Sequence, residues 1–528
     1  MQGKWGIGLK KSVIIASLCM SLLGSSSALA SGHNLSVYWQ GDGEPQTFLT
    51  ESAYEDDGQL WIPVDAVKTI YPNTVVNGSE VEVKIPLARL QTEYQDVNRL
   101  LMRGMTLSFP LTYKDGKRYL AVTETADVLG IGVNRTDDEV LLTEEKGRRH
   151  LVKDNRAKDI PAIEGKINLA WDVVTSETRN QDKISGLDVL SPTWFDVEDA
   201  DGNLKNKASR SYVDEAHNKG YRVWALVTNS FDRDLTRKVL ASPRARQNVM
   251  RQLAVYSILY DLDGINIDFE NVYEEDKDRL TAFVGEMSEL FRSMGLVSSI
   301  DVTVPAQSSY WSLCFDRKAL AEKVDYMMVM TYDEHWATSP VSGSVASLPW
   351  VETNIEKMLK LVPKEKLLLG IPLYTREWIE TQEGSKVRTK SKTLWMEDVD
   401  TIIKEKKLVP TWQEETGQDY LSYKEDGKTH RIWIENAKSI KSRLALVHMY
   451  ELAGVASWRK GFETSDIWAI YQDYLKPTLP QVEEVKQDTL TEQTVDKKKD
   501  KKAKKEKRKK DKKKKKDKKS KKEKQKKS

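Results

Sequence analysis

Three polar side chains alternate with apolar ones in DGINIDFE, residues 263–270. Asn266, Asp268 and Glu270 stand at every second position, and a β-strand places such residues on one face. Helical patterns flank the stretch, which therefore predicts a buried parallel strand. Burying two carboxyls and an amide together is costly unless they bond to one another. At the C-terminal end of a barrel strand, such a set is typical of a catalytic site.

Eight short apolar runs form a repeating pattern that begins near residue 166. Segments long enough for helices separate them, which indicates parallel strands with helical crossovers. The runs are 166–174, 186–195, 221–230, 263–270, 298–306, 325–333, 366–374 and 453–458. Their number and rhythm predict an α/β fold, a (β/α)8 TIM barrel over residues 165–475. In it, Glu270 lies at the floor of a cleft on the C-terminal face.

The interval between the seventh and eighth runs is longer than a crossover helix needs. Residues 391–407 have a helical pattern, and residues 411–436 predict antiparallel strands that turn at Asp426-Gly427. We expect a small α+β insertion, at about 381–440, that forms one wall of the cleft.

Two similar segments precede the barrel. Residues 57–76 and 115–134 align at a constant offset of 58, and each predicts a turn, a strand, a short helix and a closing strand. We expect a small α+β tandem-repeat domain over 31–148 and a charged linker over 149–164. The repeats resemble the tandem stalk-like modules known as copper amine oxidase N-terminal-like domains. The repeats contain no residues at the spacing of metal ligands. This favours a role in binding, or as a spacer, over a role in catalysis.

The two ends of the chain have compositions that cannot form a core. Residues 1–30 combine Lys residues, an apolar run and Ala28-Leu29-Ala30, which predict a secretory signal peptide and no transmembrane segment after its removal. The mature chain would keep one cysteine, Cys314, so it could form no internal disulfide. Residues 476–528 are expected to be disordered.

The Lys-rich tail, residues 496–528, is a polycation. It holds 23 Lys or Arg and 6 Asp or Glu, a net charge of +17, within a chain of net charge +3. The rest of the chain therefore carries −14. Such a tail binds anionic polymers by releasing counterions, so we expect an anionic wall polymer as its partner. Nucleic acid is not expected, because the export signal removes the chain from the main pool of nucleic acid.

The stretch DGINIDFE resembles the Asp-Gly-x-Asp-x-Asp-x-Glu signature of glycoside hydrolase family 18. MTYDEHW (330–336), GIPLYTREW (370–378) and AGVASW (453–458) resemble the motifs of the family's sixth, seventh and eighth strands, in the same order. The sequence around these motifs is most similar to the branch of bacterial spore and cell-wall N-acetylglucosaminidases. The resemblance implies a substrate-assisted retaining mechanism, in which the substrate's 2-acetamido oxygen attacks the anomeric carbon, with no cofactor and no metal.

The resemblance also implies roles for individual residues. Glu270 would be the general acid and then the base for water. Asp268 would hold the acetamido N–H, and Tyr332 would donate to the acetamido oxygen. A non-proline cis peptide is expected after Trp458, the hydrophobic floor under the reacting sugar. The candidates for substrate binding are Asn266, Asp333, Trp458, Tyr374 and Arg376.

Asn266 departs from the signature, since the family commonly has Asp there. An amide neither takes up nor loses a proton, but it can donate a hydrogen bond to Asp268. We expect activity with an altered pH profile; the alternative is a weakened or inactive enzyme.

The sequence predicts an exported glycoside hydrolase that cleaves beside N-acetylglucosamine in peptidoglycan, at the cell wall or spore surface. One alternative is a chitinase or an endo-N-acetylglucosaminidase, since all cleave beside an N-acetylated sugar. Another is a non-catalytic glycan-binding protein on the same fold, against which Glu270 argues. A metal enzyme is disfavoured because no His lies among the acids. The glycan, the choice of endo or exo cleavage, the ligand of the N-terminal repeats and the oligomeric state stay open.

Overall fold

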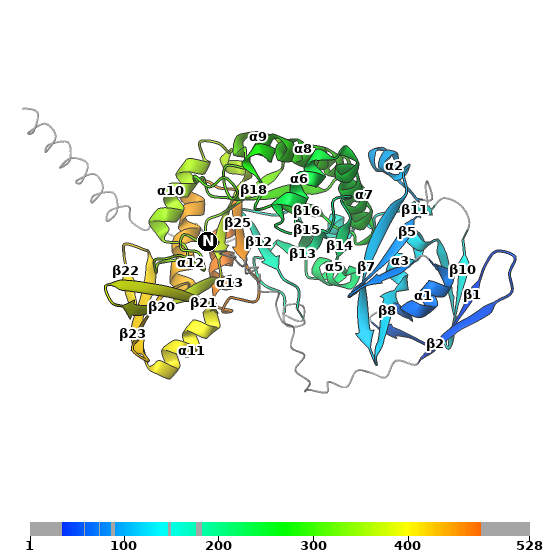
Figure 1. Cartoon of the computed structure of the whole chain (residues 1–528), viewed down its shortest axis with the longest axis horizontal. Helices are drawn as coiled ribbons and strands as arrows, with labels where there is room; N and C mark the ends of the chain where they lie inside the picture. Colours follow the sequence, from blue (N-terminus) through cyan, green and yellow to red (C-terminus); the bar gives the residue numbers. More distant parts are fainter. Residues whose placement is uncertain are drawn as a thin grey trace, which may run out of the picture. The chain divides into compact units, whose positions relative to one another are not determined.

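The computed structural model describes residues 34–476, apart from 57–58, 73, 86–89, 146–148 and 176–181 (Figure 1). The predicted signal peptide and the Lys-rich tail lie outside the described residues. The chain divides into two compact units. One comprises the residues up to Lys153 with Asn203–Ser211 and Gln247–Tyr260, and the other comprises the rest.

The first unit contains a nine-stranded sheet in the order β4-β5-β7-β8-β3-β2-β1-β10-β9, and a two-stranded sheet, β11-β6. Its strands are β1 (Leu35–Gln40), β2 (Thr47–Asp56), β3 (Gln59–Pro63), β4 (Val75–Asn77), β5 (Glu80–Ile85), β6 (Leu90–Thr92), β7 (Met105–Lys114), β8 (Lys117–Ala121), β9 (Ile131–Arg135), β10 (Glu139–Glu144), β11 (Arg149–Leu151) and β14 (Leu204–Asn206). Its helices include α1 (Val64–Ile70), α2 (Gln95–Leu101) and α3 (Val122–Leu129).

The two similar segments of this unit have the same order of elements. One runs β3-α1-β4-β5 and the other β8-α3-β9-β10, and β3 pairs antiparallel with β8. Gly130 ends α3 with a positive φ of 71°, a conformation that glycine adopts without strain. The assignment of these segments to a known kind of module remains a prediction.

The second unit is a closed barrel of eight parallel strands, which confirms the predicted TIM barrel. The strands pair in the order β12-β13-β15-β16-β17-β18-β19-β25, and β25 pairs with β12 to close the ring. They are β12 (Ile167–Asp172), β13 (Val189–Val197), β15 (Arg222–Thr228), β16 (Gly264–Asp268), β17 (Val297–Thr303), β18 (Tyr326–Met330), β19 (Leu367–Pro372) and β25 (Gly454–Trp458). Each lies almost wholly within one of the predicted apolar runs.

Helices follow the strands as the crossover pattern predicts. They are α5 (Arg210–Asn218), α6 (Arg233–Ala241), α7 (Pro243–Leu259), α8 (Lys277–Ser293), α9 (Arg317–Lys323), α10 (Leu348–Met358), α12 (Ala437–Met449) and α13 (Ile467–Leu475); the short turns are η1 (Arg156–Asp159), η2 (Glu274–Asp276) and η3 (Lys364–Lys366). Local sequence sets their ends. The Asp232 side chain accepts hydrogen bonds from two backbone N–H groups in the first turn of α6, and the Ser242 hydroxyl caps α7.

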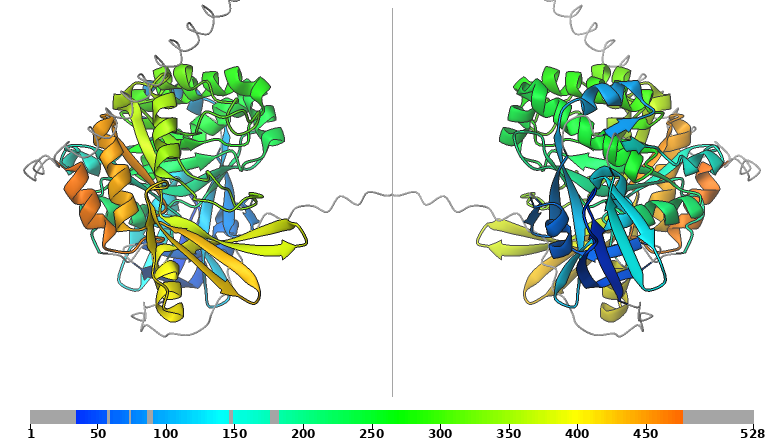
Figure 2. Two further views of the ribbon diagram at one scale, coloured as in Figure 1. Left: turned by 90° about the vertical axis from the view of Figure 1, so that its left-hand side faces the viewer. Right: turned by 90° about the vertical axis from the view of Figure 1, so that its right-hand side faces the viewer.

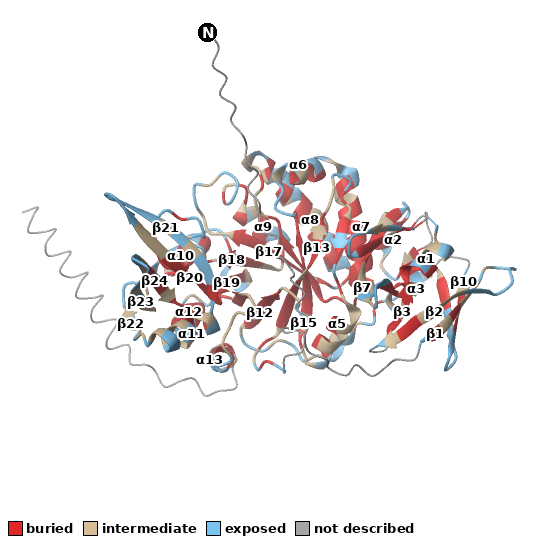
Figure 3. Cartoon of the chain, turned by 60° about the horizontal axis from the view of Figure 1, so that its bottom comes forward, coloured by how far each residue is buried: buried red, intermediate tan, exposed pale blue. Residues whose placement is uncertain are grey.

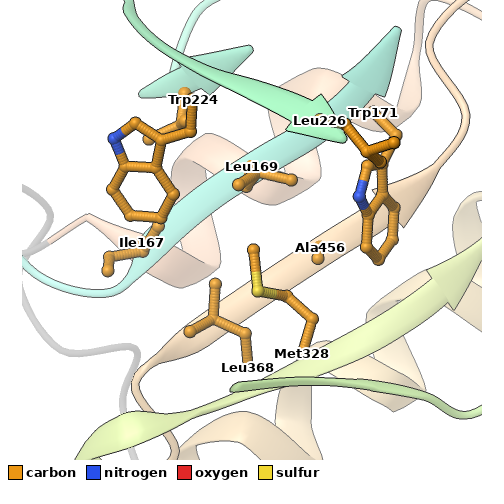
Figure 4. Packing of buried hydrophobic residues seen from close by; sticks show 9 residues of the cluster. Ile167, Leu169, Trp171, Trp224, Leu226, Met328, Leu368 and Ala456 are labelled. Carbon is orange, nitrogen blue, oxygen red and sulfur yellow. The ribbon is translucent and has the colours of Figure 1, made fainter. Parts of the chain in front are cut away.

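Apolar side chains fill the barrel interior. Figure 4 shows them pointing toward one another from several strands; the cluster comprises Ile167, Leu169, Trp171, Val189, Trp224, Leu226, Met328, Leu368 and Ala456. The strands are buried along most of their length (Figure 3). At the first residue of β25, a Cβ on Gly454 would lie 2.1 Å from the Ile167 carbonyl oxygen, so only glycine fits. The barrel interior is a packed core, and in such barrels the active site lies at the C-terminal end of the strands.

The insertion between β19 and β25 is an α+β element, as predicted. It comprises β20 (Tyr374–Glu383), β21 (Lys386–Trp395), α11 (Met396–Lys406), β22 (Thr411–Gln413), β23 (Gln418–Glu425) and β24 (Lys428–Ile434), in a sheet of order β21-β20-β24-β23-β22. The long β20–β21 hairpin extends outward from the barrel (Figure 2). Val399 of α11 packs on Leu394, Leu421, Ile432 and Ile434 of the sheet.

Two details of the predicted insertion were wrong. It begins at Tyr374, directly after β19, rather than near 381. Residues 391–395 are strand and not helix, because β21 pairs with β20 along its whole length, from Glu383↔Lys386 to Tyr374↔Trp395. Within the described ranges, no helix is both long enough and apolar enough to cross a membrane.

Candidate active site

The alternating stretch 263–270 contains strand β16, as its pattern predicted. Asn266, Asp268 and Glu270 follow one another toward the C-terminal end of this strand. Asn266 and Asp268 lie on the strand and are buried. Glu270 lies two residues beyond its end rather than last on it. A side chain holds it there: the Glu270 N–H donates to Asn229 Oδ1 at 3.1 Å, and Asn229 Nδ2 donates to the Glu270 carbonyl at 2.7 Å. Asn229 follows β15, the neighbour of β16, so its amide extends the backbone pairing to Glu270.

Asn266 connects four strands at the floor of the site. Its Oδ1 accepts hydrogen bonds from Trp171 Nε1 at 2.9 Å and from Ser191 Oγ at 3.1 Å. Its Nδ2 donates to Asp301 Oδ1 at 2.9 Å. The expected hydrogen bond from Asn266 to Asp268 was therefore wrong, because the amide is directed at a third acid on β17. Asp301 was not predicted, although it is the one carboxyl in the apolar run 298–306.

Burial raises the pKa of all three carboxyls. The pKa of Asp268 rises to about 7 through loss of solvation, and among the described residues its Oδ1 has no hydrogen-bond partner. The pKa of Glu270 lies well above its ordinary value because of burial and the nearby charges of Asp268 and Asp333. Burial and Asp268 also raise the pKa of Asp301. Carboxyls that raise one another's pKa in this way retain a proton among them, so the site can hold an acid at neutral pH.

A second group of residues lies at the ends of β18 and β19. Asp333 Oδ1 accepts hydrogen bonds from the Tyr374 hydroxyl at 2.8 Å and from Arg376 Nη2 at 2.7 Å. The Tyr332 and Tyr374 rings meet edge to face, with centroids 6.3 Å apart. Burial, and then Tyr374 and the carboxyls of Asp301, Glu270 and Asp268, raise the pKa of Tyr332 well above its ordinary value. The Tyr332 hydroxyl therefore remains a hydrogen-bond donor.

Trp458 completes the site at the end of β25. Its ring lies 5.9 Å from that of Trp171 at a tilt of 59°, and with Tyr332 it packs on the barrel core. The Trp458–Arg459 peptide is cis, as the resemblance implied. Seven of the eight predicted site residues therefore lie at or beyond the C-terminal ends of β16, β18, β19 and β25, and Asn266 lies at the middle of β16. Within the described part of the chain, no cluster of His, Cys, Asp and Glu could hold a metal ion.

Exposed aromatic residues surround the same end of the barrel and were not predicted. They follow strands β15, β17, β18 and β19 in the sequence; they are Phe231, Tyr310, Trp311, Trp336 and Trp395. Segments that follow the strands of such a barrel lie at its C-terminal end, where substrates bind, so these side chains are candidates for substrate contact. Their sequence signal is weak, since a Trp in a loop pattern is as compatible with a core position.

Asn266→Asp is expected to lower the free energy of unfolding at pH 8 by about 1–3 kcal/mol. The substitution replaces the donor to Asp301 with a second carboxyl, and two charges cannot share that hydrogen bond. At pH 5 the pair can hold one proton between them, so the loss should be smaller and the pH profile of hydrolysis should change. Urea unfolding at both pH values, with exposed Asn134→Asp as the control, tests this. Equal stability of parent and variant at pH 8 would contradict it.

The sequence profile of the family described as Glycosyl hydrolases family 18 matches residues 174–462. The match covers more than half of the chain, and this chain therefore belongs to that family. With the closed barrel and its carboxyl site, it is a glycoside hydrolase.

Two curated relatives from Bacillus subtilis (strain 168) are similar to this chain. One, described as the uncharacterized glycosylase YvbX, is 30% identical over 281 residues, which are 51% of this chain and 79% of that protein. The other, described as a cortical fragment-lytic enzyme, is 24% identical over 255 residues, which are 47% of this chain and 58% of that protein. The chain thus spans a little over half the length of the second relative.

Solved structures show the same fold. The alignment with the spore cortex-lytic enzyme SleL of Bacillus cereus has a TM-score of 0.54 at 20% identity. It covers 60% of this chain and 76% of the SleL chain. The alignment with a chitinase from Chromobacterium violaceum ATCC 12472 has a TM-score of 0.53 at 22% identity. It covers 59% of this chain and 99% of the chitinase chain.

Proposed function

We propose that this protein cleaves glycan strands beside N-acetylglucosamine in peptidoglycan by substrate-assisted retaining catalysis. The observation that carries the proposal is a matched donor and acceptor. Asp268 Oδ1 is buried without a partner among the described residues. The partly buried Tyr332 hydroxyl is a donor whose pKa is raised by burial and by Asp301, Glu270 and Asp268. An acetamido group offers an N–H to the first and a carbonyl oxygen to the second.

In this mechanism Glu270 protonates the leaving oxygen and later takes a proton from water. Its raised pKa keeps the proton available at neutral pH. Asp268 orients the acetamido group, whose oxygen attacks the anomeric carbon as the leaving group departs. Water then attacks the anomeric carbon and displaces the acetamido oxygen. Trp458 supports the reacting sugar from below, and Asp333, held by Tyr374 and Arg376, binds a sugar hydroxyl.

Peptidoglycan is preferred as the substrate because relatives are described as cortical fragment-lytic and spore cortex-lytic enzymes. A chitinase or an endo-N-acetylglucosaminidase is the second candidate, since chitinases share the fold. Mass spectrometry of the products from peptidoglycan, chitin oligomers and a high-mannose glycoprotein would separate them. We expect products only, or fastest, from peptidoglycan, with an N-acetylated sugar at the new reducing end. Cleavage of chitin alone would contradict the proposal, and binding without cleavage would indicate a non-catalytic protein.

We further propose that the protein is exported and stays at the cell wall or spore surface. The signal peptide predicted at residues 1–30 supports export. Two elements could retain the protein: the N-terminal segments that resemble copper amine oxidase N-terminal-like modules, and the Lys-rich tail. The tail has a charge of +17 by composition, which favours it as the part that binds anionic polymers.

Removal of the tail is expected to abolish salt-sensitive retention on isolated walls without changing turnover of a small soluble substrate. Counterion release makes such binding fall steeply with salt. The measurement compares the full chain with one that ends near Val495, at low and high salt. Identical wall retention by both would assign the role to the N-terminal segments instead.

A further inference from the structure

Trp395 forms a supported aromatic platform at the junction of the insertion and the barrel. Its ring stacks on that of Phe462, with centroids 5.0 Å apart at 24°, and the backbones connect through the Met396 N–H and the Phe462 carbonyl at 2.9 Å. The Trp395 N–H also donates to the Asp398 carboxylate at 2.9 Å. Despite these contacts the residue is 43% exposed, so much of the indole is available to a ligand.

The register of the hairpin places this platform on the same side as the candidate site. Trp395 pairs with Tyr374, and Thr393 pairs with Arg376. Paired residues of an antiparallel ladder share a face, and the bond from Arg376 Nη1 to Thr393 Oγ1 at 2.9 Å shows this directly. Tyr374 and Arg376 both bond to Asp333 from that face. Trp395 is therefore beside the group that we assign to sugar binding.

Arg459 supplies a cation at the same place. It directly follows Trp458, and its guanidinium lies over the Phe462 ring, 3.9 Å from the centroid. Within the described residues it has no carboxylate at ion-pair distance. The two acids that act on it electrostatically are Asp172 and Glu463, and both bond elsewhere. Asp172 accepts from the Tyr212 hydroxyl, and Glu463 accepts from the Gly461 N–H and Trp468 Nε1.

A half-buried guanidinium of this kind favours an anionic ligand. Burial lowers the pKa of Arg459, yet an Arg side chain keeps its charge at physiological pH. A charge that is partly removed from water gains most when a carboxylate meets it. The Phe462 ring packs against both Trp395 and Arg459, so an exposed aromatic ring and a cation flank one side chain.

We propose that Trp395 and Arg459 form a subsite for a strand of N-acetylated sugars that carries carboxylates, next to the sugar held over Trp458. One sugar ring of the strand stacks on Trp395, and a carboxylate of a neighbouring sugar pairs with Arg459 on the other side of Phe462. The proposal rests on the proposed function and deepens it, because a neutral polymer such as chitin would bring no carboxylate to Arg459. It makes the site selective for acidic N-acetylated glycans.

The test compares two N-acetylated substrates of equal length. One is a peptidoglycan glycan strand freed of its peptides, which bears a carboxylate on every second sugar, and the other is a neutral chitin oligomer. Arg459→Gln is expected to reduce kcat/KM on the acidic strand about tenfold more than on chitin, mainly through KM, because a charged hydrogen bond is lost. Arg459→Lys should restore part of the difference. Trp395→Ala should raise KM on both substrates by about tenfold.

Exposed Arg388→Gln on β21 is the matched control and should change neither substrate. If Arg459→Gln does not fold, added salt gives the same information with the chain that ends near Val495, which lacks the tail that also binds anionic polymers. The preference of that chain for the acidic strand should fall as salt rises. An equal effect of Arg459→Gln on both substrates, or a preference insensitive to salt, would overturn the subsite. If the unaltered protein cleaves neither substrate, the proposed function fails instead.

Discussion

Glu270→Gln is expected to reduce hydrolysis by at least about 100-fold and to leave the fold and glycan binding in place. General acids typically contribute 10²–10⁴-fold to a rate, and the amide has the shape of the carboxyl without the proton to transfer. The two hydrogen bonds that position residue 270 involve its backbone and Asn229, so the substitution leaves them unchanged.

The measurement is the rate on peptidoglycan strands together with the affinity for an uncleaved strand. Glu289→Gln, an exposed position of α8, serves as the control for the substitution itself. A Glu270→Gln protein that keeps more than about a tenth of the parent rate would show that another group is the acid, because that loss is below what general acids contribute. Loss of affinity as well would indicate that Glu270 holds the substrate rather than protonating it.

The period of two along a strand made the centre of the site predictable. That alternation alone places Asn266, Asp268 and Glu270 on one face, and eight runs separated by helical segments define the barrel around them. These features depend on neighbours in the sequence, which a local pattern records.

Features that depend on distant residues could not be predicted in the same way. The partner of Asn266 is Asp301, which the barrel brings close from 35 residues away. The hold on Glu270 comes from Asn229, 41 residues earlier. Residues 391–395 were expected to be helical because their own pattern allows a helix, whereas pairing with β20 makes them a strand. The contact of Trp395 with Phe462 likewise crosses between the insertion and the last loop of the barrel.

Asp268→Asn is expected to slow hydrolysis of N-acetylated strands by roughly 10²-fold, since an amide cannot carry the charge that stabilises the cationic intermediate. Its effect should be smaller on any substrate whose cleavage does not depend on an acetamido group. Equal losses on substrates with and without N-acetyl groups would count against substrate assistance, even if Glu270 proves to be the acid.

The same substitution should stabilise the fold above neutral pH, and the direction follows from the pKa of Asp268. Burial raises that pKa from 3.8 to about 7, so the folded protein binds the proton more tightly than the unfolded chain does. The carboxyl's contribution to stability is complete below about pH 4 and is lost as the pH rises to about 7. The amide of the variant has no such proton to lose, so Asp268→Asn should exceed the parent in free energy of unfolding by about 1 kcal/mol or more at pH 8, and by less at pH 5. Urea unfolding at both pH values measures this, with exposed Asp473→Asn on α13 as the control. A variant less stable than the parent at pH 8 would mean that other groups of the folded protein compensate the Asp268 charge. Burial of this carboxylate would then not destabilise the fold.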